Sequence, residues 1–571
     1  MKRWRLVEGL DEPAGSLARH SGLPHPLARA LVARGVPSAT EADRFLKPRL
    51  SALSDPLSLP GMASAVDRIW RAIRDKEPVA VYGDYDVDGV TSAALMVRVL
   101  GKLGARVSAC LPNRIEEGYG LSPESLERCI GKFHPHLIVT TDCGSGSVEA
   151  VALARKEGID VVVTDHHEIT GVPAEAVAVV NPKLGDDVSA RMLAGVGVAF
   201  KVCHALLKVG RDRRLAVAET VDLRDYLDLV ALGTIADVVP LLHENRILAR
   251  HGLTCLNSTG RVGLRALADV AGVSGEMGAY HVGFVLGPRI NAAGRMGQAE
   301  AALELLLTDQ PSRARELAAS LDASNRERKR IETEITEAAI ARIDALFDPT
   351  SHYGIVVGEP GWHVGVIGIV ASRLAARYGR PAVVVGFDAD GIGRGSCRSV
   401  PGFDLVRGLK SCEDHLSQFG GHAMAAGLEV KHADFTRFSE AFQQACQQAL
   451  AGQDLTTVLD LDAWVSLGEI FSPGFSETLG LLGPFGEGNP EPVWGVRGVS
   501  LIGPPRILKE RHLKMTVGIG NRQCEAIGFG MGDRDVPDGE LDLAFVLREN
   551  TYMGRTNLQL QLQDFRPAED E

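Results

Sequence analysis

The sequence lacks the features that mark secreted and membrane-bound proteins. Its 9 cysteines are an odd number without regular spacing, and no two form a CxxC pair, which argues against a disulfide framework and a cysteine zinc site. No uninterrupted run of about 18 apolar residues occurs, so no transmembrane helix is predicted. The first residues, MKRWRLVEGLDEP, are basic but contain no apolar segment, so no secretory signal is expected. These absences predict a protein of the reducing cytoplasm that has no membrane partner.

An excess of positive charge is also lacking. The formal net charge is −12, which lowers the expectation of a nucleic-acid partner. It does not exclude one, because binding depends on local patches rather than on the overall balance. Carboxylates that hold metal ions would also be neutralised. The net charge therefore neither establishes nor excludes a nucleic-acid partner.

The chain of 571 residues is long enough for several domains. The first 60 residues have the Pro and Gly breaks of short helices and form an N-terminal helical extension. An alternation of apolar strands and helices then begins, with strands predicted at 78–83, 137–141, 161–164 and 177–180. Strands that alternate with helices predict a parallel sheet covered on both faces.

The second half of the chain contains three further patterns. Residues 309–347 have no Gly, have no Pro beyond Pro311 and are rich in Ala, Glu, Arg and Ile, which predicts one long helix. It either links two domains or packs on the surface of one. Apolar runs at 353–358 and 381–387 predict a second α/β unit, and short alternating strands after about residue 455 predict a small barrel. The fold class is thus two α/β domains joined by a long helix, plus a C-terminal β barrel, with predicted boundaries at 1–60, 61–308, 309–347, 348–454 and 455–571.

Acidic and histidine residues directly follow three predicted strands. The loop GDYDVDG (83–89) holds Asp84, Asp86 and Asp88, Asp142 follows the second of these strands, and DHH (165–167) follows the third. In open α/β sheets, ligands bind at the carboxyl ends of the strands. Carboxylates packed so closely need cations, and oxygen ligands with an added imidazole suit Mg²⁺ or Mn²⁺. Two such ions about 3.5–4 Å apart can activate a water and clamp a phosphoryl group.

Each residue also has a simpler explanation. A single Asp after a strand is more often a helix N-cap or turn residue, but three strand-end clusters together favour a metal site. Asp237 lies in the apolar stretch 231–241 and must be paired or bound to metal if it is buried. On its own it is equally explained as a helix-terminal residue.

Several motifs of the sequence resemble those of a known family. GDYDVDG, DHH (165–167) and GGH (420–422) are similar to the signature motifs of the DHH phosphoesterase superfamily. GPRINAAGRM (287–296), GWHVGVIGIVASRL (361–374) and LGPFGEGNPEP (482–492) resemble the RecJ family in particular. The resemblance spans about residues 20–568. Three letters such as DHH match often by chance, whereas this ordered set is highly specific. It implies a DHH domain, a DHHA1-like domain and an OB-fold barrel.

The resemblance implies roles for single residues. The implied metal ligands, with Asp142 bridging two ions, are Asp86, Asp88, Asp142, His166 and Asp237. The implied catalytic residues that line the centre or contact the phosphate are Asp84, His167 and His422. Some related sequences have a His two residues before the first Asp of the loop, where this chain has Tyr82.

Other matched residues are implied to bind the substrate. Arg114, Ser396 and Arg398 match a pocket for a 5′-terminal phosphate, which the planar guanidinium fork suits. Cys397 stands where the family commonly has Gly, and its side chain is expected to crowd that pocket. Further contacts to phosphates are implied for Arg289, Asn291, Arg295, Gly420 and Gly421. For an isolated arginine, a solvated surface charge is the simpler explanation, and a lone GGH is more often a turn.

The barrel is the implied nucleic-acid-binding domain. Local positive charge comes from Arg506, Lys509, Arg511, His512 and Lys514. The aromatic candidates for stacking on bases, which are equally explained as core residues, are Phe485, Trp494, Tyr552 and Phe565.

The implied activity is a single-stranded-DNA-specific exonuclease of DNA repair and recombination. It would work from the 5′ end with two Mn²⁺ or Mg²⁺ ions and release 5′-mononucleotides. Single-stranded DNA is the expected partner, and a helicase and a single-strand-binding protein are further candidates. Two alternatives remain: a DHH phosphodiesterase acting on short oligonucleotides, cyclic dinucleotides or pyrophosphate, and an inactive DNA-binding scaffold.

Overall fold

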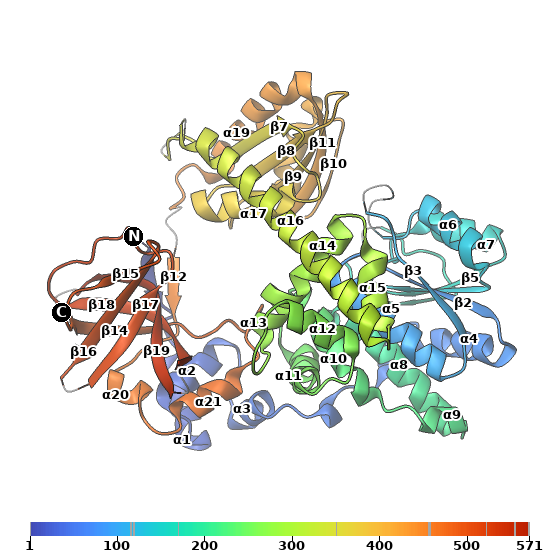
Figure 1. Cartoon of the computed structure of the whole chain (residues 1–571), viewed down its shortest axis with the longest axis horizontal. Coiled ribbons are helices and arrows are strands. Elements are labelled where there is room, and N and C mark those ends of the chain that lie inside the picture. The colour runs from blue at the N-terminus through green and yellow to red at the C-terminus, as the bar shows by residue number, and fades with distance from the viewer. Residues whose placement is uncertain are drawn as a thin grey trace.

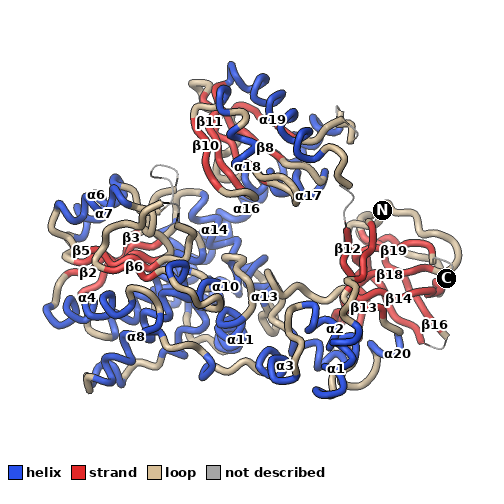
Figure 2. Tube along the Cα trace, turned by 180° about the vertical axis from the view of Figure 1, so that it is seen from behind, coloured by secondary structure: helices blue, strands red, loops and turns tan. Residues whose placement is uncertain are grey.

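The computed structural model has three bodies, two α/β domains and a barrel, and one long helix runs from the first domain to the second (Figure 1). It describes residues 2–568 apart from 115–116, 118–119, 170, 346, 350, 455–457, 521 and 553–554. Seen from behind, the two α/β domains and the barrel again lie around a common centre (Figure 2).

The first domain is built on a parallel sheet of order β3-β2-β4-β5-β6. Its strands are β2 (Pro78–Gly83), β3 (Arg106–Cys110), β4 (Leu137–Thr141), β5 (Asp160–Thr164) and β6 (Ala178–Val180). The central strand β4 is buried along its whole length, which explains its uninterrupted apolar sequence. The four predicted strands are confirmed. β3 was not predicted, because it is a half-exposed edge strand with little apolar character.

Helices cover both faces of this sheet, as the alternating pattern predicted. One face packs against α4 (Met62–Asp75), α5 (Val87–Lys102) and α8 (Gly195–Asp212), and the other against α6 (Pro123–Phe133) and α7 (Val148–Lys156). A helical layer completes the domain with α9 (Ala216–Glu219), α10 (Leu227–Ala236), α11 (His243–Asn257), α12 (Val262–Val270), α13 (Ala279–His281), α14 (Gly287–Arg295) and α15 (Ala299–Leu307). The layout places the carboxyl ends of β2, β4 and β5 at one edge of the domain.

The predicted long helix is α16 (Pro311–Asp344). Leu317 and Leu321 lie in the core of the first domain, whereas Ile335 and Ile343 lie in the core of the second. The helix therefore joins two domains and is not a surface helix of one.

The second domain has a mixed sheet of order β10-β11-β9-β8-β7. The predicted strands are β7 (Ile355–Pro360) and β8 (Ala382–Phe387), which pair in parallel, with α17 (Ile367–Tyr378) between them. The antiparallel strands β9 (Ile392–Arg398), β10 (Gln418–Gly421) and β11 (Ala425–Lys431) were not predicted, because they are rich in Gly and polar residues. α18 (Leu405–Lys410) and α19 (Phe435–Leu450) complete the domain.

The C-terminal barrel is a partly closed sheet of order β13-β14-β18-β19-β17-β16-β15, with a further pairing of β14 to β16. Its strands are β13 (Ala463–Trp464), β14 (Trp494–Leu501), β15 (Arg506–Leu508), β16 (His512–Ile519), β17 (Arg522–Gly528), β18 (Leu541–Tyr552) and β19 (Arg555–Pro567). Short helices α20 (Leu467–Ile470) and α21 (Phe475–Leu482) precede β14. Trp494 and Phe565 are buried in the barrel core, so for these two aromatics the core explanation holds. The side chain of Tyr552 lies outside the described residues.

The N-terminal segment packs on this barrel rather than standing alone. Strand β1 (Arg3–Leu6) pairs in parallel with β12 (Val458–Leu461), and α1 (Asp11–Ser21), α2 (His25–Ala33) and α3 (Ala39–Leu46) add side chains to the barrel core. The strand was not predicted, because its partner lies more than 400 residues further along the chain. In the part of the chain that the structure describes, no helix is long and apolar enough to cross a membrane.

Candidate metal centre and phosphate pocket

The strand-end residues gather at one edge of the first domain. Asp86 is the N-cap of α5 and its Oδ1 accepts a hydrogen bond from Gly89 N at 3.0 Å. Asp88 lies in the first turn of the same helix and is buried. The helix-cap explanation therefore holds for Asp86, and the metal-ligand assignment stays a prediction, since this cap uses one carboxylate oxygen.

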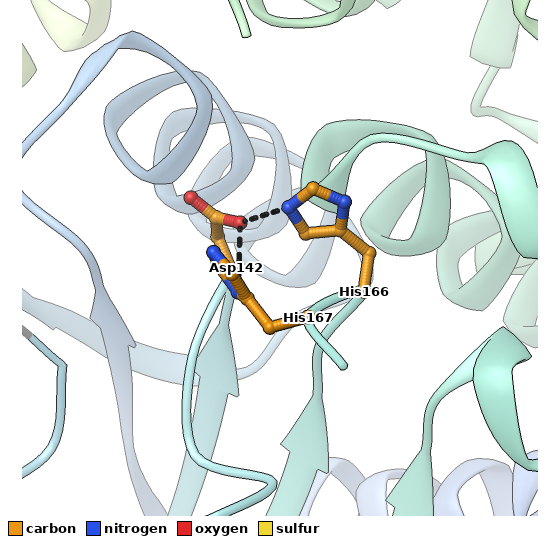
Figure 3. Close-up of side chains that lie close together, drawn as sticks. All are labelled: Asp142, His166 and His167. Atoms are coloured by element: carbon orange, nitrogen blue, oxygen red, sulfur yellow. Dashed lines mark ion pairs between the residues drawn. The ribbon is translucent and has the colours of Figure 1, made fainter. Parts of the chain in front are cut away.

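The carboxylates and imidazoles lie within reach of one ion or two. His166 Nε2 is 3.1 Å from Asp142 Oδ1, 3.7 Å from Asp237 Oδ2 and 3.8 Å from Asp88 Oδ2. His167 Nδ1 is 4.0 Å from the same oxygen of Asp142, and both rings turn toward it (Figure 3). Each of three sets has all its ligand atoms within 4.8 Å of one another: Asp142 with His166 and His167, Asp88 with His166 and Asp237, and Asp84 with Asp86 and Asp142. Asp142 belongs to two of the sets, as a bridging ligand would.

Several of these atoms are buried without a partner. Asp142 Oδ1, His166 Nε2 and Asp237 Oδ2 have no hydrogen-bond partner among the residues that the structure describes. A buried polar atom left unpaired costs about 1–3 kcal/mol, and more when it is charged. Divalent ions would satisfy all three atoms, and the oxygen-rich donor set fits Mn²⁺ or Mg²⁺.

The pKa values of the clustered carboxylates and imidazoles also favour a site for divalent ions. Burial, followed by the neighbouring carboxylates, raises the pKa of Asp88 to about 7 and that of Asp237 to about 9, and raises the pKa of Asp142 well above its ordinary value. Burial, reinforced by His167, lowers the pKa of His166 to about 4, so its ring stays neutral as a metal ligand requires. Bound cations would keep the carboxylates ionised at neutral pH.

Two residues to which the sequence assigned no role of their own support these ligands. Asp165 Oδ1 accepts hydrogen bonds from His166 N and from His167 Nδ1, each at 2.8 Å, and so orients the DHH segment. Gly195 N, at the start of α8, donates to Asp88 Oδ2 at 2.6 Å. A Cβ atom at position 195 would lie 2.7 Å from Cγ of Asp142, so only glycine fits there. No local signal marks Gly195, since its partners are distant in sequence.

The proposed bridging residue has unusual backbone geometry. Asp142 has a φ of 64°, in the left-handed region that non-glycine residues rarely adopt. Its N–H donates to Thr164 O at 2.9 Å, which fixes the turn after β4. Strain of this kind persists where surrounding contacts hold it, and it is concentrated at functional sites.

The residues matched to the phosphate pocket meet between the two α/β domains. Arg398 Nη1 lies 3.3 Å from Ser396 Oγ, and Arg295 Nη1 donates to Gly365 O at 3.0 Å across the domain junction. Burial lowers the pKa of Arg295 to about 10 and also lowers that of Arg398, and the nearby charge of Arg114 adds to both shifts. Three guanidinium groups thus share one region, which suits an anion.

Cys397 does not crowd this pocket, contrary to the expectation from sequence. Successive residues of a strand point to opposite faces. Ser396 and Arg398 therefore share one face of β9, while the Cys397 side chain is fully buried in the core of the second domain.

Other predicted contact residues are held by the protein itself. Arg289 pairs with Asp322 at 2.9 Å and donates to Val285 O, and Asn291 Oδ1 accepts from Val87 N at 3.0 Å, steadying the start of α5. Gly420 and Gly421 lie on the exposed edge strand β10. His422 is exposed beside them, in the turn between β10 and β11. Their phosphate contacts stay predictions.

Comparison with known proteins follows the same division of the chain. Family models match at residues 78–234 (DHH family, N-terminal domain), 351–448 (DHHA1 domain) and 461–564 (RecJ OB domain). The chain is 37% identical over 575 residues to the single-stranded-DNA-specific exonuclease RecJ of Bacillus subtilis, covering 99% of this chain and 71% of that protein. The chain belongs to the RecJ family.

Other RecJ proteins give the same result. The Haemophilus influenzae protein of the same name is 37% identical, with 99% of this chain and 100% of that protein covered. The crystal structure of RecJ in complex with Mn²⁺ from Thermus thermophilus superposes with a TM-score of 0.84 at 32% identity, covering 100% of this chain and 80% of that chain. The RecJ fold therefore extends over the whole chain.

Proposed function

We propose that this chain is a metal-dependent exonuclease that degrades single-stranded DNA from its 5′ end and releases 5′-mononucleotides, in DNA repair and recombination. The observation that carries this proposal is a buried set of carboxylate and imidazole atoms without hydrogen-bond partners among the described residues, close to a cluster of arginines. The relatives named above are single-stranded-DNA-specific exonucleases.

The metal ions would be held by Asp86, Asp88, Asp142, His166 and Asp237, with Asp84 and His167 beside them. Related structures contain RecJ in complex with Mn²⁺ and with Mg²⁺. Two such ions supply an activated water and neutralise the charge that develops on a phosphoryl group. Because Nδ1 of His167 is bound to Asp165, Nε2 of that ring is available to a phosphate oxygen. His422 would contact a neighbouring phosphate from the second domain.

The direction of digestion would come from the arginine cluster. An exonuclease that starts only at a 5′ end needs binding energy from a group found only there, and the terminal phosphate is that group. Arg114, Ser396 and Arg398 would bind it, while Arg289, Asn291, Arg295, Gly420 and Gly421 follow the backbone beyond. The barrel would hold the remaining strand.

The same proposal extends to partners and setting. A helicase and a single-strand-binding protein, which generate and cover single strands, are proposed partners, and the cytoplasm is the proposed location. The domain boundaries at residues 60, 308, 347 and 454 are proposed likewise.

The decisive experiment follows a 5′-phosphorylated, 3′-labelled single strand with Mn²⁺, Mg²⁺ or EDTA present. We expect mononucleotides to be released progressively from the 5′ end, with either metal and not with EDTA, while a blunt duplex resists. Digestion from the 3′ end, or activity on dinucleotides alone, would contradict the proposal and favour another DHH activity.

A further inference from the structure

Tyr85 occupies an unusual position between the first two aspartates of the metal loop. Its ring lies under the guanidinium of Arg114, with Cζ 4.6 Å from the ring centroid. Arg114 Nη1 is buried and has no hydrogen-bond partner within the described ranges of the chain. The Tyr85 ring thus holds the Arg114 guanidinium in place and leaves its positive charge intact. A carboxylate in the same place would neutralise that charge.

The ring is itself held from two directions. Helix α14 packs on it at Gly294, where a Cβ atom would lie 2.8 Å from Tyr85 Cδ2. The backbone of Tyr85 donates to Asp84 Oδ1 at 2.8 Å, within the metal loop. The position of Tyr85 is therefore determined by α14, which packs on its ring, and by the loop of the proposed metal ligands, which binds its backbone.

The far end of the segment that carries Arg114 is tied to the same strand and loop. Tyr82, at the end of β2, donates from its hydroxyl to Gly120 O at 3.1 Å, and Gly120 N donates to Asp84 Oδ1 at 3.4 Å. Both anchors and the Tyr85 ring come from residues 82–85. The tyrosine that replaces a family histidine thus has a structural contact of its own.

The neighbouring charges explain why a ring is needed. Arg114 lies near Arg295 and Arg398: burial lowers the pKa of both, the charge of Arg114 lowers both further, and Asp86 offsets part of this shift at Arg295. The three guanidinium charges repel one another as long as no anion is bound. The negative face of an aromatic ring offsets part of this repulsion while leaving the guanidinium N–H groups for a ligand.

We propose that Tyr85 is a positioning residue for recognition of the DNA end: its ring holds Arg114 in place for the 5′-terminal phosphate and links that arginine to the metal loop. This inference rests on the proposed function. It adds a residue that acts through Arg114 and touches neither metal nor DNA.

The test compares the preference for a 5′-phosphate over a 5′-hydroxyl strand in Tyr85→Phe, Tyr85→Leu and Tyr85→Met. The preference is measured as the ratio of kcat/KM values with Mn²⁺, and as the ratio of dissociation constants in EDTA by fluorescence anisotropy. We expect Leu and Met to lower it about fivefold, as loss of a partly buried cation–π contact predicts, and Phe to keep it within about twofold. Met is unbranched and can adapt to the space that the ring leaves, so it also reports if Leu fails to fold.

A double substitution decides whether Tyr85 acts through Arg114. On an Arg114→Ala background, Tyr85→Leu should lower the preference no further. The matched control is Tyr226→Leu, which removes another ring that carries an arginine, Arg261 at 5.0 Å, and should leave the preference unchanged. An unchanged preference in Tyr85→Leu, an equal loss on both strands, or an undiminished effect without Arg114 would overturn the inference. A wild-type protein that ignores the 5′-phosphate would instead refute the proposed function.

Discussion

At the scale of single residues, several side chains of the site have two tasks. Asp86 caps a helix with one oxygen and is a proposed metal ligand. Asp165 is not a proposed metal ligand, but it orients both histidines of the DHH segment. Asp142 combines a left-handed backbone with a buried oxygen that has no partner among the described residues. Such residues are costly to the fold unless cations are bound, which makes metal binding and stability interdependent.

The first prediction concerns Asp142→Ala. Hydrolysis should fall by more than about 100-fold, beyond the 10- to 100-fold loss typical of an outer-shell partner, because the residue is proposed to contact both ions. Mn²⁺ at 100 times its Kd should stabilise the wild-type protein by about 2.7 kcal/mol and the variant by much less, as thermal melting would measure. A folded variant that keeps near-normal turnover would contradict the two-metal assignment.

The second prediction concerns Arg398→Ala. A charge-assisted hydrogen bond to phosphate contributes about 1.5–3 kcal/mol, so kcat/KM on a 5′-phosphorylated strand should fall roughly 10- to 100-fold. The loss should shrink on a 5′-hydroxyl strand, and the Mn²⁺ concentration for half-maximal activity should not change. Equal losses on both strands would mean that Arg398 supports the fold or the general DNA path.

Sequence reasoning found residues that lie in local motifs and missed those whose contacts are distant. Asp84, Asp86, Asp88, Asp142, His166 and His167 were predictable because their clusters directly follow apolar strands, whereas the roles of Asp237 and His422 rested on the family resemblance. The ring of Tyr85 and the glycine at position 195 were not, because their partners Arg114 and Asp88 lie in other segments. The burial of Cys397 could have been predicted from strand alternation, but β9 has too few apolar residues to be recognised as a strand.

At the scale of elements, the start of α8 has a larger role than its sequence indicates. Its first N–H groups, from Gly195 and Val196, donate to the two oxygens of Asp88 at 2.6 and 2.8 Å. A helix N-terminus favours a negative charge through its dipole and its free N–H groups. The parallel strands were predictable from their apolar runs, whereas this contact between α8 and α5 depends on tertiary packing.

The third prediction tests this helix start with Gly195→Ala. The added methyl group would press on Asp142 and displace either the carboxylate or the helix, so we expect at least a tenfold loss of activity and weaker Mn²⁺ binding by calorimetry. The control is Gly131→Ala in α6, where a Cβ atom would meet nothing within 4 Å. That change should leave activity intact and add up to about 1 kcal/mol of stability. Normal Mn²⁺ affinity in Gly195→Ala would mean that the centre tolerates a shift of α8.

At the scale of the whole molecule, the barrel is joined firmly to the rest of the chain. Arg246 of α11 donates to Leu481 O and Gly483 O at the foot of the barrel, each at 2.9 Å, and to Phe45 O of α3 at 2.7 Å. The N-terminal helices share the barrel core. Deleting residues from 455 onward would therefore expose apolar surface on α1–α3, and point substitutions are the cleaner way to test the role of the barrel in DNA binding.

The fourth prediction removes positive charge from the exposed edge of the barrel. Arg506, Lys509 and Arg511 are exposed at β15 and the turn after it, whereas Lys514 is paired with Glu525 at 2.6 Å. Each phosphate contact to a single strand contributes about 0.7 to the slope of log affinity against log salt. Replacing all three residues by Ala should therefore lower that slope by about 2 for a long strand, while hydrolysis of strands too short to reach the barrel stays unchanged.

The matched control removes three exposed cations of the first domain, on the side where its parallel strands begin: Lys102, Arg106 and Lys156. They lie at the ends of α5 and α7 and at the start of β3, away from the carboxyl ends of the strands. Because both triple variants change the net charge equally, a general electrostatic effect would weaken binding equally in both. An unaltered slope in the barrel variant, or an equal fall in the control, would mean that the strand does not run along this edge. A loss confined to the barrel variant and to long strands would separate the holding of DNA by the barrel from its cleavage between the α/β domains.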